Sequence, residues 1–431
     1  MQNKFLFLAL LLLSKASFGT PHHPERWQTQ KGVQVIFYKA MEVPMLDISL
    51  AFRAGSAYDG ERFGLSAMTS HMLNQGNQGK GATVVAQSLA NLGSQYSEEN
   101  GYDMVVFNLR TLVSPEALSP SLAIFKGILN QPDFPPNAFA REKNQQLMAI
   151  KQSKDSPEDI AIKAFFKILY KDHPYGHPVD GTTETVSSIQ REELVNFYKR
   201  YYVANNAILV IVGAIDNQQA HTLAENLTNP MTPGNKAPAI PEAKKLSTSQ
   251  TVQIPFPASQ TVLRLGQIGI DHNNPHYFPL MVGNYLLGGG ALVSKLAIEL
   301  REKNGLTYHV DSQFIPMPGK GPFLIGLSTR KKQTQKALTL TKEVLSNFIQ
   351  KGPSEEELLA AKQYLTGSFP LSLSGNKAIA GILLRMAFYQ LPDDYLDTYL
   401  KNIEAVTAAS VQAAFQQVID PKTLLLIEVG S

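Results

Sequence analysis

Residues Ala207–Gly213 read AILVIVG, a short apolar run of the kind that forms a buried strand. The run Leu424–Gly430 reads LLLIEVG and suits an equivalent strand, and the final glycines of the two runs are 217 positions apart. Asn137 and Ser354, each a candidate N-cap of a helix next to a proline, are separated by the same 217 positions. Two matched landmarks at one offset indicate an internal duplication.

A proline-rich segment separates the two predicted halves. Residues 229–249 contain four prolines within twelve positions, which prevents regular structure and predicts a semi-extended linker. The predicted domains are therefore residues 20–228 and residues 250–431. Helical stretches follow pairs of strands and do not alternate strictly with them, so we expect an α+β fold and not a doubly wound sheet. The predicted strands, besides the two runs above, are Gly32–Phe37, Asp47–Ala54, Met104–Leu109, Val262–Ile268 and Pro322–Ser328.

The first nineteen residues have the pattern of a secretory signal peptide. Lys4 gives a basic start, Phe5–Leu13 is an unbroken apolar run, and Ser17 and Gly19 form a small-x-small cleavage site. The apolar run is too short to span a membrane, which takes about 20 residues, and no later segment reaches 18. We expect an exported protein without a stable membrane anchor, located in a bacterial periplasm.

Composition excludes several classes of function. Of 431 residues, 39 are Lys or Arg and 36 are Asp or Glu, and the resulting charge of +3 argues against a nucleic-acid partner. The chain has no cysteine, which excludes disulfides, a cysteine nucleophile and thiolate metal sites. Any transition-metal chemistry therefore depends mainly on the nine histidines.

The segment Gly64–Gly76, GLSAMTSHMLNQG, resembles the zinc-site helix of the pitrilysin/insulinase-like (M16) zinc peptidases, of the bacterial M16B type. The resemblance implies two similar domains, each a mainly antiparallel sheet with helices packed on it, as in mitochondrial processing peptidase and LuxS-like metallopeptidases, enclosing a chamber. Further segments match in family order: RAGSAYDG at Arg53–Gly60, DHPYGHPVDGT at Asp172–Thr182, FYKRYYVANNAILVIVGAID at Phe197–Asp216 and LLGGGALVSKLAIELREKNGLTYHV at Leu286–Val310.

The resemblance also implies that the zinc site is degenerate. Active members carry H-x-x-E-H, in which histidines at i and i+4 share a helix face and bind zinc, and the glutamate activates water. Those positions are here Ala67, Ser70 and His71, and the third family ligand, a glutamate, falls near Met148. A catalytic zinc takes three protein ligands, so His71 alone predicts no bound metal and no hydrolysis by this chain alone.

The second half retains another part of the family's active site. The resemblance implies that an arginine and a tyrosine spaced R-x6-Y act near the zinc, and Arg301 and Tyr308 have that spacing. A tyrosine can donate a hydrogen bond to a developing oxyanion, and an arginine can hold substrate carbonyls. The alternative is an exposed arginine at a helix end and a tyrosine packed in a strand.

Three hypotheses follow. The first is a non-catalytic subunit that supplies Arg301 and Tyr308 in trans to an H-x-x-E-H partner, which would bring the zinc and complete a heterodimeric peptidase acting on peptides. The second is an inert peptide-binding or scaffold protein of the same fold. The third is an independent enzyme with an unusual metal site, although the spacing of His173 and His177 falls in a turn rich in proline and glycine. We expect Gly101–Arg110 to provide a sheet edge for peptides, although the preceding Gly93–Asn100 departs from the family's pattern.

Overall fold

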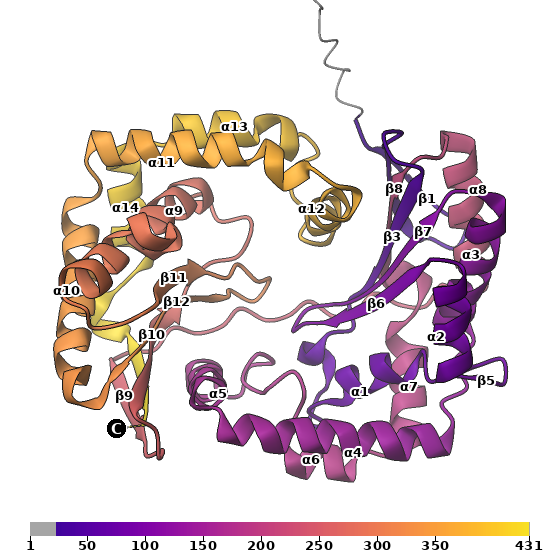
Figure 1. The fold of residues 1–431 in the computed structure, drawn as a ribbon, viewed down its shortest axis with the longest axis horizontal. Helices are drawn as coiled ribbons and strands as arrows, with labels where there is room; N and C mark the ends of the chain where they lie inside the picture. The colour runs from indigo at the N-terminus through magenta and orange to yellow at the C-terminus, as the bar shows by residue number, and fades with distance from the viewer. Residues whose placement is uncertain (1–22, 431) are drawn as a thin grey trace, which may run out of the picture.

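The computed structural model describes residues 23–430, so the predicted signal peptide lies outside the described residues. Two halves, each a sheet with helices on its outer side, face each other (Figure 1). No helix among the described residues is both long and apolar enough to cross a membrane.

The first sheet has six strands in the order β1-β2-β8-β3-β7-β6. All neighbours are antiparallel except β2 and β8, which are parallel. Its strands are β1 (Glu25–Gln28), β2 (Gln34–Lys39), β3 (Met45–Phe52), β6 (Gln95–Asn100), β7 (Val105–Leu112) and β8 (Ala207–Gly213).

The second sheet repeats this arrangement. Its order is β11-β12-β10-β13-β9, and β13 and β9 are the parallel pair. Its strands are β9 (Gln250–Ile254), β10 (Gln260–Ile268), β11 (Val310–Phe314), β12 (Pro322–Arg330) and β13 (Leu425–Val429). Read from the β9 edge, each strand occupies the place of a first-half strand about 217 positions earlier. The predicted α+β fold with two similar halves is therefore confirmed, and the predicted strands agree with the observed ones to within a few residues.

The helices repeat at the same offset. The clearest pair is α7 (Arg191–Tyr201) and α14 (Ala408–Val418), both 11 residues long and 217 positions apart. The other helices of the first half are α1 (Leu65–Met72), α2 (Ala82–Asn91), α3 (Pro115–Asn130), α4 (Pro136–Gln152), α5 (Pro157–Tyr170), α6 (Thr183–Ser188) and α8 (Asn217–Thr228). Those of the second half are α9 (Tyr277–Asn284), α10 (Thr334–Lys351), α11 (Glu355–Ser368), α12 (Asn376–Phe388) and α13 (Tyr395–Ala405).

Of the two predicted N-caps, Ser354 is confirmed and Asn137 is wrong. The Ser354 side chain accepts a hydrogen bond from the backbone N–H of Glu357 at 3.2 Å and forms the capping box at the start of α11, as predicted. Asn137 is not the N-cap of α4, because that helix begins at Pro136 and its N-cap is Pro135. A proline at the first helical position has a preset φ and no N–H left without a partner, so it can start the helix one residue earlier.

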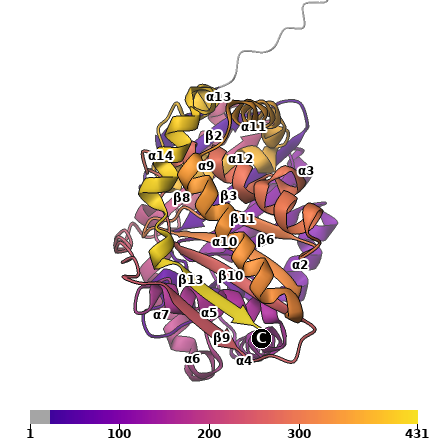
Figure 2. The same cartoon turned by 90° about the vertical axis from the view of Figure 1, so that its left-hand side faces the viewer.

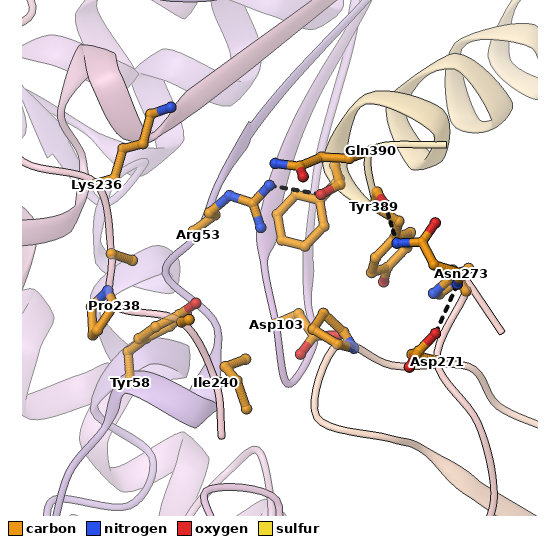
Figure 3. Close-up of a pocket in the computed structure, with 15 residues that line it drawn as sticks. Arg53, Tyr58, Asp103, Lys236, Pro238, Ile240, Asp271, Asn273, Tyr389 and Gln390 are labelled. Carbon is orange, nitrogen blue, oxygen red and sulfur yellow. Dashed lines mark hydrogen bonds between the residues drawn. The ribbon is translucent and has the colours of Figure 1, made fainter. Parts of the chain in front are cut away.

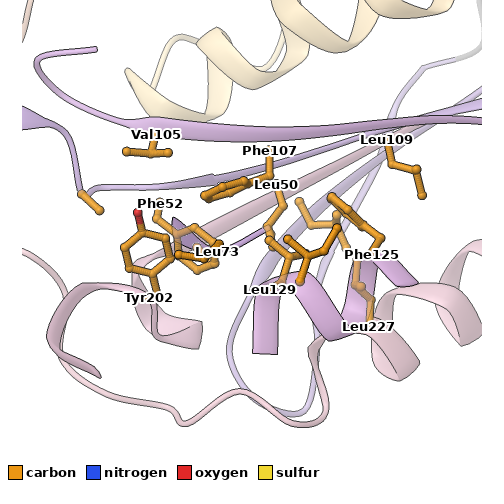
Figure 4. Packing of buried hydrophobic residues seen from close by; sticks show 14 of the residues in the cluster. Leu50, Phe52, Leu73, Val105, Phe107, Leu109, Phe125, Leu129, Tyr202 and Leu227 are labelled. Carbon is orange, nitrogen blue, oxygen red and sulfur yellow. The ribbon is translucent and has the colours of Figure 1, made fainter. Parts of the chain in front are cut away.

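The outer face of the first sheet packs on its own helices and forms a large apolar core. Phe52 and Phe107 meet at 6.2 Å between ring centroids, and the ring of Tyr202 lies 4.9 Å from that of Phe52. Leu50 and Leu73, both fully buried, lie in the same cluster (Figure 4). Burial of each such side chain stabilises the fold by about 1.5–3 kcal/mol, so this core fixes the position of α1 against the sheet.

The inner faces of the two sheets are covered by exchanged helices. Helix α5, from the first half, packs on β10 and β13 of the second sheet, whereas α12, from the second half, packs on β3 and β8 of the first. Leu383 of α12 is fully buried in a cluster that includes Ile208 and Val210, and Phe165 of α5 is fully buried in one that includes Ile427. Figure 2 shows that α5 lies close to β9 and β13 in the view turned by 90°. Each half therefore completes the core of the other.

Two connecting segments bear on function. Among the described residues, no helix or strand lies between Thr228 and Gln250, where the linker is predicted. The prediction that Gly101–Arg110 forms a sheet edge is wrong, because β7 lies between β3 and β6. The edge strand is β6. Its sequence, QYSEEN, has no apolar alternation that would predict a strand, because its side chains lie in exposed and half-buried positions by turns.

Candidate functional site

The position of helix α1 is set by its N-terminus. Gly64 precedes the helix with a φ of 92°, a conformation that suits glycine. The carboxylate of Asp59 accepts hydrogen bonds from the backbone N–H groups of Gly64 and Ser66, each at 2.7 Å. The side-chain amide of Gln146 on α4 donates to the Gly64 carbonyl at 3.2 Å. These contacts hold α1 between the sheet and α4, in the place where the family's zinc site would be built.

The residues that replace the family's zinc-site residues on α1 contact other groups of the protein. Ala67 and Ser70 are completely buried. The Ser70 hydroxyl donates to the Ala67 carbonyl at 2.9 Å and accepts a hydrogen bond from the side-chain amide of Asn100 on β6. The hydroxyl is thus committed to two partners in the protein.

His71 also faces strand β6. Its Nε2 atom lies 3.8 Å from Oε1 of Glu98, and Oε2 of Glu98 accepts a hydrogen bond from the Tyr96 hydroxyl at 2.8 Å. Burial lowers the pKa of His71 and raises the pKa of Glu98 to about 7. Burial thus disfavours the charged form of both groups. Sequence reasoning missed Glu98 and Asn100, since nothing local places QYSEEN beside α1.

These residues do not fit a catalytic zinc. Met148, at the position expected for the third ligand, is 62% exposed, and its thioether is not among the His, Cys, Asp and Glu groups that bind a catalytic zinc. Across residues 23–430, no group of three or more His, Asp or Glu side chains is arranged to hold a metal ion. His173 and His177 lie in a turn, where His173 Nε2 contacts the Pro241 carbonyl at 2.8 Å and the His177 ring stacks on Phe63. Among residues 23–430, His71 is thus without the further ligands that a catalytic zinc takes.

We expect the purified mature chain to retain well below one equivalent of zinc after incubation with ZnCl2 and desalting. The reason is that His71 alone offers one ligand, while a tight site needs at least three. Elemental analysis measures this directly, and a His71→Ala variant is the matched control that should give the same value. Stoichiometric zinc that is lost on replacing His71 would contradict this account of the site.

Arg301 and Tyr308 lie together on the second half. Arg301 is in a π-helical segment, Ala297–Lys303, and Tyr308 lies in the turn that leads into β11. The guanidinium carbon of Arg301 is 4.9 Å from the centroid of the Tyr308 ring, a cation–π contact. Tyr308 is nonetheless 83% exposed, so it is not a tyrosine packed in a strand.

Within residues 23–430, no ion pair joins the two parts of the predicted site. Among the described residues, Arg301 forms an ion pair only with its neighbour Glu302, at 3.5 Å, and His71 only with Glu98. The Arg301–Glu302 pair lies in the second half of the chain, and the His71–Glu98 pair lies in the first half. The structure thus contains, at the α1 positions, side chains bound to other groups of the protein and, in the second half, an exposed Tyr308 resting on a half-buried Arg301.

Models of one family match two consecutive parts of the chain. Residues 35–183 match Insulinase (Peptidase family M16), and residues 188–365 match the Peptidase M16 inactive domain. The crystal structure of a peptidase M16 inactive domain from Pseudomonas fluorescens superposes with a TM-score of 0.91 at 34% identity, covering 94% of this chain and 97% of that one.

Two curated relatives have different names. The "Non-peptidase homolog YmxG" of Helicobacter pylori is 25% identical over 387 residues, which cover 89% of this chain and 88% of that protein. An "Uncharacterized zinc protease" of Rickettsia felis is 28% identical over 337 residues, or 78% and 80% of the two chains. Fold and site define a metallopeptidase-type protein whose zinc positions are incomplete. The chain belongs to the M16 peptidase family, which confirms the resemblance seen in the sequence.

Proposed function

We propose that this chain is the non-catalytic subunit of a periplasmic M16-type zinc peptidase and that it supplies Arg301 and Tyr308 in trans to an H-x-x-E-H partner. One observation carries the proposal: Tyr308 is 83% exposed and rests on Arg301. At the zinc-site positions of the same chain, by contrast, the Ser70 hydroxyl is bound to the Ala67 carbonyl. An exposed aromatic side chain held in place by a cation is suited to a site that a second chain completes. The periplasmic location rests on the signal-peptide pattern of residues 1–19.

In the proposed assembly, the Tyr308 hydroxyl donates a hydrogen bond to the oxyanion that forms when water adds to a substrate peptide carbonyl. Such a donor stabilises the transition state more than the ground state. Arg301 holds the Tyr308 ring through the cation–π contact and has guanidinium donors for a substrate carbonyl. Neither residue can cleave a peptide bond alone, and the relatives called "inactive domain" and "non-peptidase homolog" agree with a chain of this kind.

The alternative is a catalytically inert protein that binds peptides or acts as a scaffold. It is favoured by the free edge of β6, whose unpaired backbone groups could add an extended peptide as a further strand. In this alternative, the contacts of Ser70 and His71 with β6 hold that edge in position. The two functions differ in whether a partner's activity depends on this chain.

Mixing experiments test the proposal. We expect this chain alone to show no peptidase activity, and an H-x-x-E-H M16 chain encoded nearby to gain activity on a fluorogenic peptide when the two are mixed. Activity should saturate at a 1:1 ratio, and the two chains should elute together in size-exclusion chromatography. A partner that is fully active alone and gains nothing on mixing would favour the inert alternative.

A further inference from the structure

A pocket of about 460 Å³ lies where the two halves and the linker meet (Figure 3). Arg53 enters it from the end of β3, Asp103 from the turn between β6 and β7, and Tyr389 from the end of α12. The linker segment Lys236–Ile240 forms one wall, and Asp271–Asn273 lie on the other side. Pockets of this size at domain junctions, with a few converging polar groups, are the usual form of small-ligand sites.

The acidic residues of this pocket already have donors. The Asp103 carboxylate accepts a hydrogen bond from the buried Tyr175 hydroxyl at 2.5 Å, and the Asp271 carboxylate accepts one from the backbone N–H of Asn273 at 2.8 Å. Both carboxylates are therefore held in place by donors of the protein itself.

The cations of the pocket form no direct ion pair among the described residues. Arg53 donates to the Phe388 carbonyl at 2.7 Å, and its guanidinium carbon lies 4.2 Å from the centroid of the Phe388 ring. Within residues 23–430, neither Arg53 nor Lys236 forms an ion pair with a carboxylate. Burial lowers the pKa of Arg53, although the nearby carboxylate of Asp103 acts in the opposite direction, so this cation is held in a poorly solvated place. An anionic group entering the pocket would meet Arg53, whose guanidinium has donors beyond the one that binds the Phe388 carbonyl, and the flexible Lys236 side chain on the linker wall.

The wall formed by the linker offers backbone groups. In the part of the chain that the structure describes, residues 236–240 make no hydrogen bond to another backbone group, and only the N–H of Ala237 is used, donating to the Asn206 side chain at 3.0 Å. Opposite this wall, His272 stacks on Tyr389 at 3.6 Å, and its Nδ1 atom is buried without a hydrogen-bond partner. An extended chain with free backbone groups pairs with another extended chain, which points to a peptide and not to a simple anion.

We propose that this junction pocket binds the C-terminal end of a short, extended peptide. The terminal carboxylate pairs with Arg53 and Lys236, and the peptide backbone pairs with residues 236–240. Arginine suits this role because its planar donors match a carboxylate in bidentate fashion. The site is separate from Arg301 and Tyr308, so it can be present or absent whether or not the chain serves in a peptidase assembly.

Equilibrium binding to the isolated mature chain tests the site. A fluorescein-labelled tetrapeptide with a free C-terminus should bind about tenfold or more tightly than the same peptide with a C-terminal amide, because a charge-assisted hydrogen bond is lost. Lys236→Gln should weaken binding of the free acid several-fold and leave binding of the amide unchanged. Lys244→Gln, on the same linker but outside the pocket, is the matched control and should bind like the unmodified chain.

Other outcomes would overturn the site. Equal affinity for the acid and the amide, or equal binding by the Lys236→Gln and Lys244→Gln variants, would show that the pocket does not read a carboxylate. Displacement of the peptide by an equal concentration of inorganic phosphate would show a general anion site and would also overturn the assignment. Arg53→Gln removes a contact to Phe388 as well, so the exposed Lys236 is the better probe if that variant fails to fold.

Discussion

Replacing Tyr308 by phenylalanine is expected to lower kcat of the assembled two-chain peptidase about 100-fold, because removing one donor to an oxyanion typically costs a factor of that size. The ring, its contact with Arg301 and its exposure remain, so assembly of the two chains should not change. KM should change little, since the hydroxyl acts mainly in the transition state. Steady-state kinetics with a fluorogenic peptide at saturating partner concentration measure the effect.

The matched control for Tyr308→Phe is Tyr364→Phe. Tyr364 is also an exposed tyrosine of the second half, at 58%, and stacks on Tyr285 away from Arg301, so its replacement should leave kcat unchanged. Arg301→Ala should lower kcat and raise KM together, because it removes both the support of the Tyr308 ring and the donors proposed for a substrate carbonyl. An assembly that keeps its full rate with Tyr308→Phe and Arg301→Ala would show that the second half does not take part in catalysis.

The two parts of the site differed in how far the sequence could describe them. The loss of a zinc ligand at Ala67 and of the water-activating glutamate at Ser70 could be predicted from the resemblance to the family's H-x-x-E-H helix, because each role depends on residue type. The contacts of Ser70 and His71 with Asn100 and Glu98 could not be predicted, because Asn100 and Glu98 belong to a strand without apolar alternation. Their pairing with α1 is set by the tertiary fold. The exposure of Tyr308 was equally hidden, since spacing does not report burial.

The fold, too, has features that the sequence predicts and features that it does not. The apolar runs that became β8 and β13 have strong local signals, so the two halves could be predicted from the sequence. The exchange of α5 and α12 could not be predicted, because the sequence of an amphipathic helix shows that it has an apolar face but not which sheet covers that face. The repeat offset shows that these helices hold equivalent places in the two halves, and only the structure shows that each packs on the other half's sheet.

This exchange predicts that the two halves unfold together. Leu383 of α12 is fully buried against the first sheet, so Leu383→Ala should lower the free energy of unfolding by about 2–5 kcal/mol through lost burial and a cavity. The chain has a single tryptophan, Trp27 on β1 of the first sheet, and its fluorescence therefore reports on the first half alone. Urea denaturation followed by Trp27 fluorescence and by far-UV circular dichroism should show both transitions moving to lower urea by the same amount.

Leu371→Ala is the control for Leu383→Ala, because Leu371 precedes α12 and is 71% exposed. Its replacement should change the free energy of unfolding by no more than about 0.5 kcal/mol. If the halves were independent units that merely touch, Leu383→Ala would shift the circular dichroism transition and leave the Trp27 transition in place. Such a split would contradict the exchange as a source of stability. A common shift would instead mean that the linker joins two halves that cannot fold separately, because each provides a helix for the other's core.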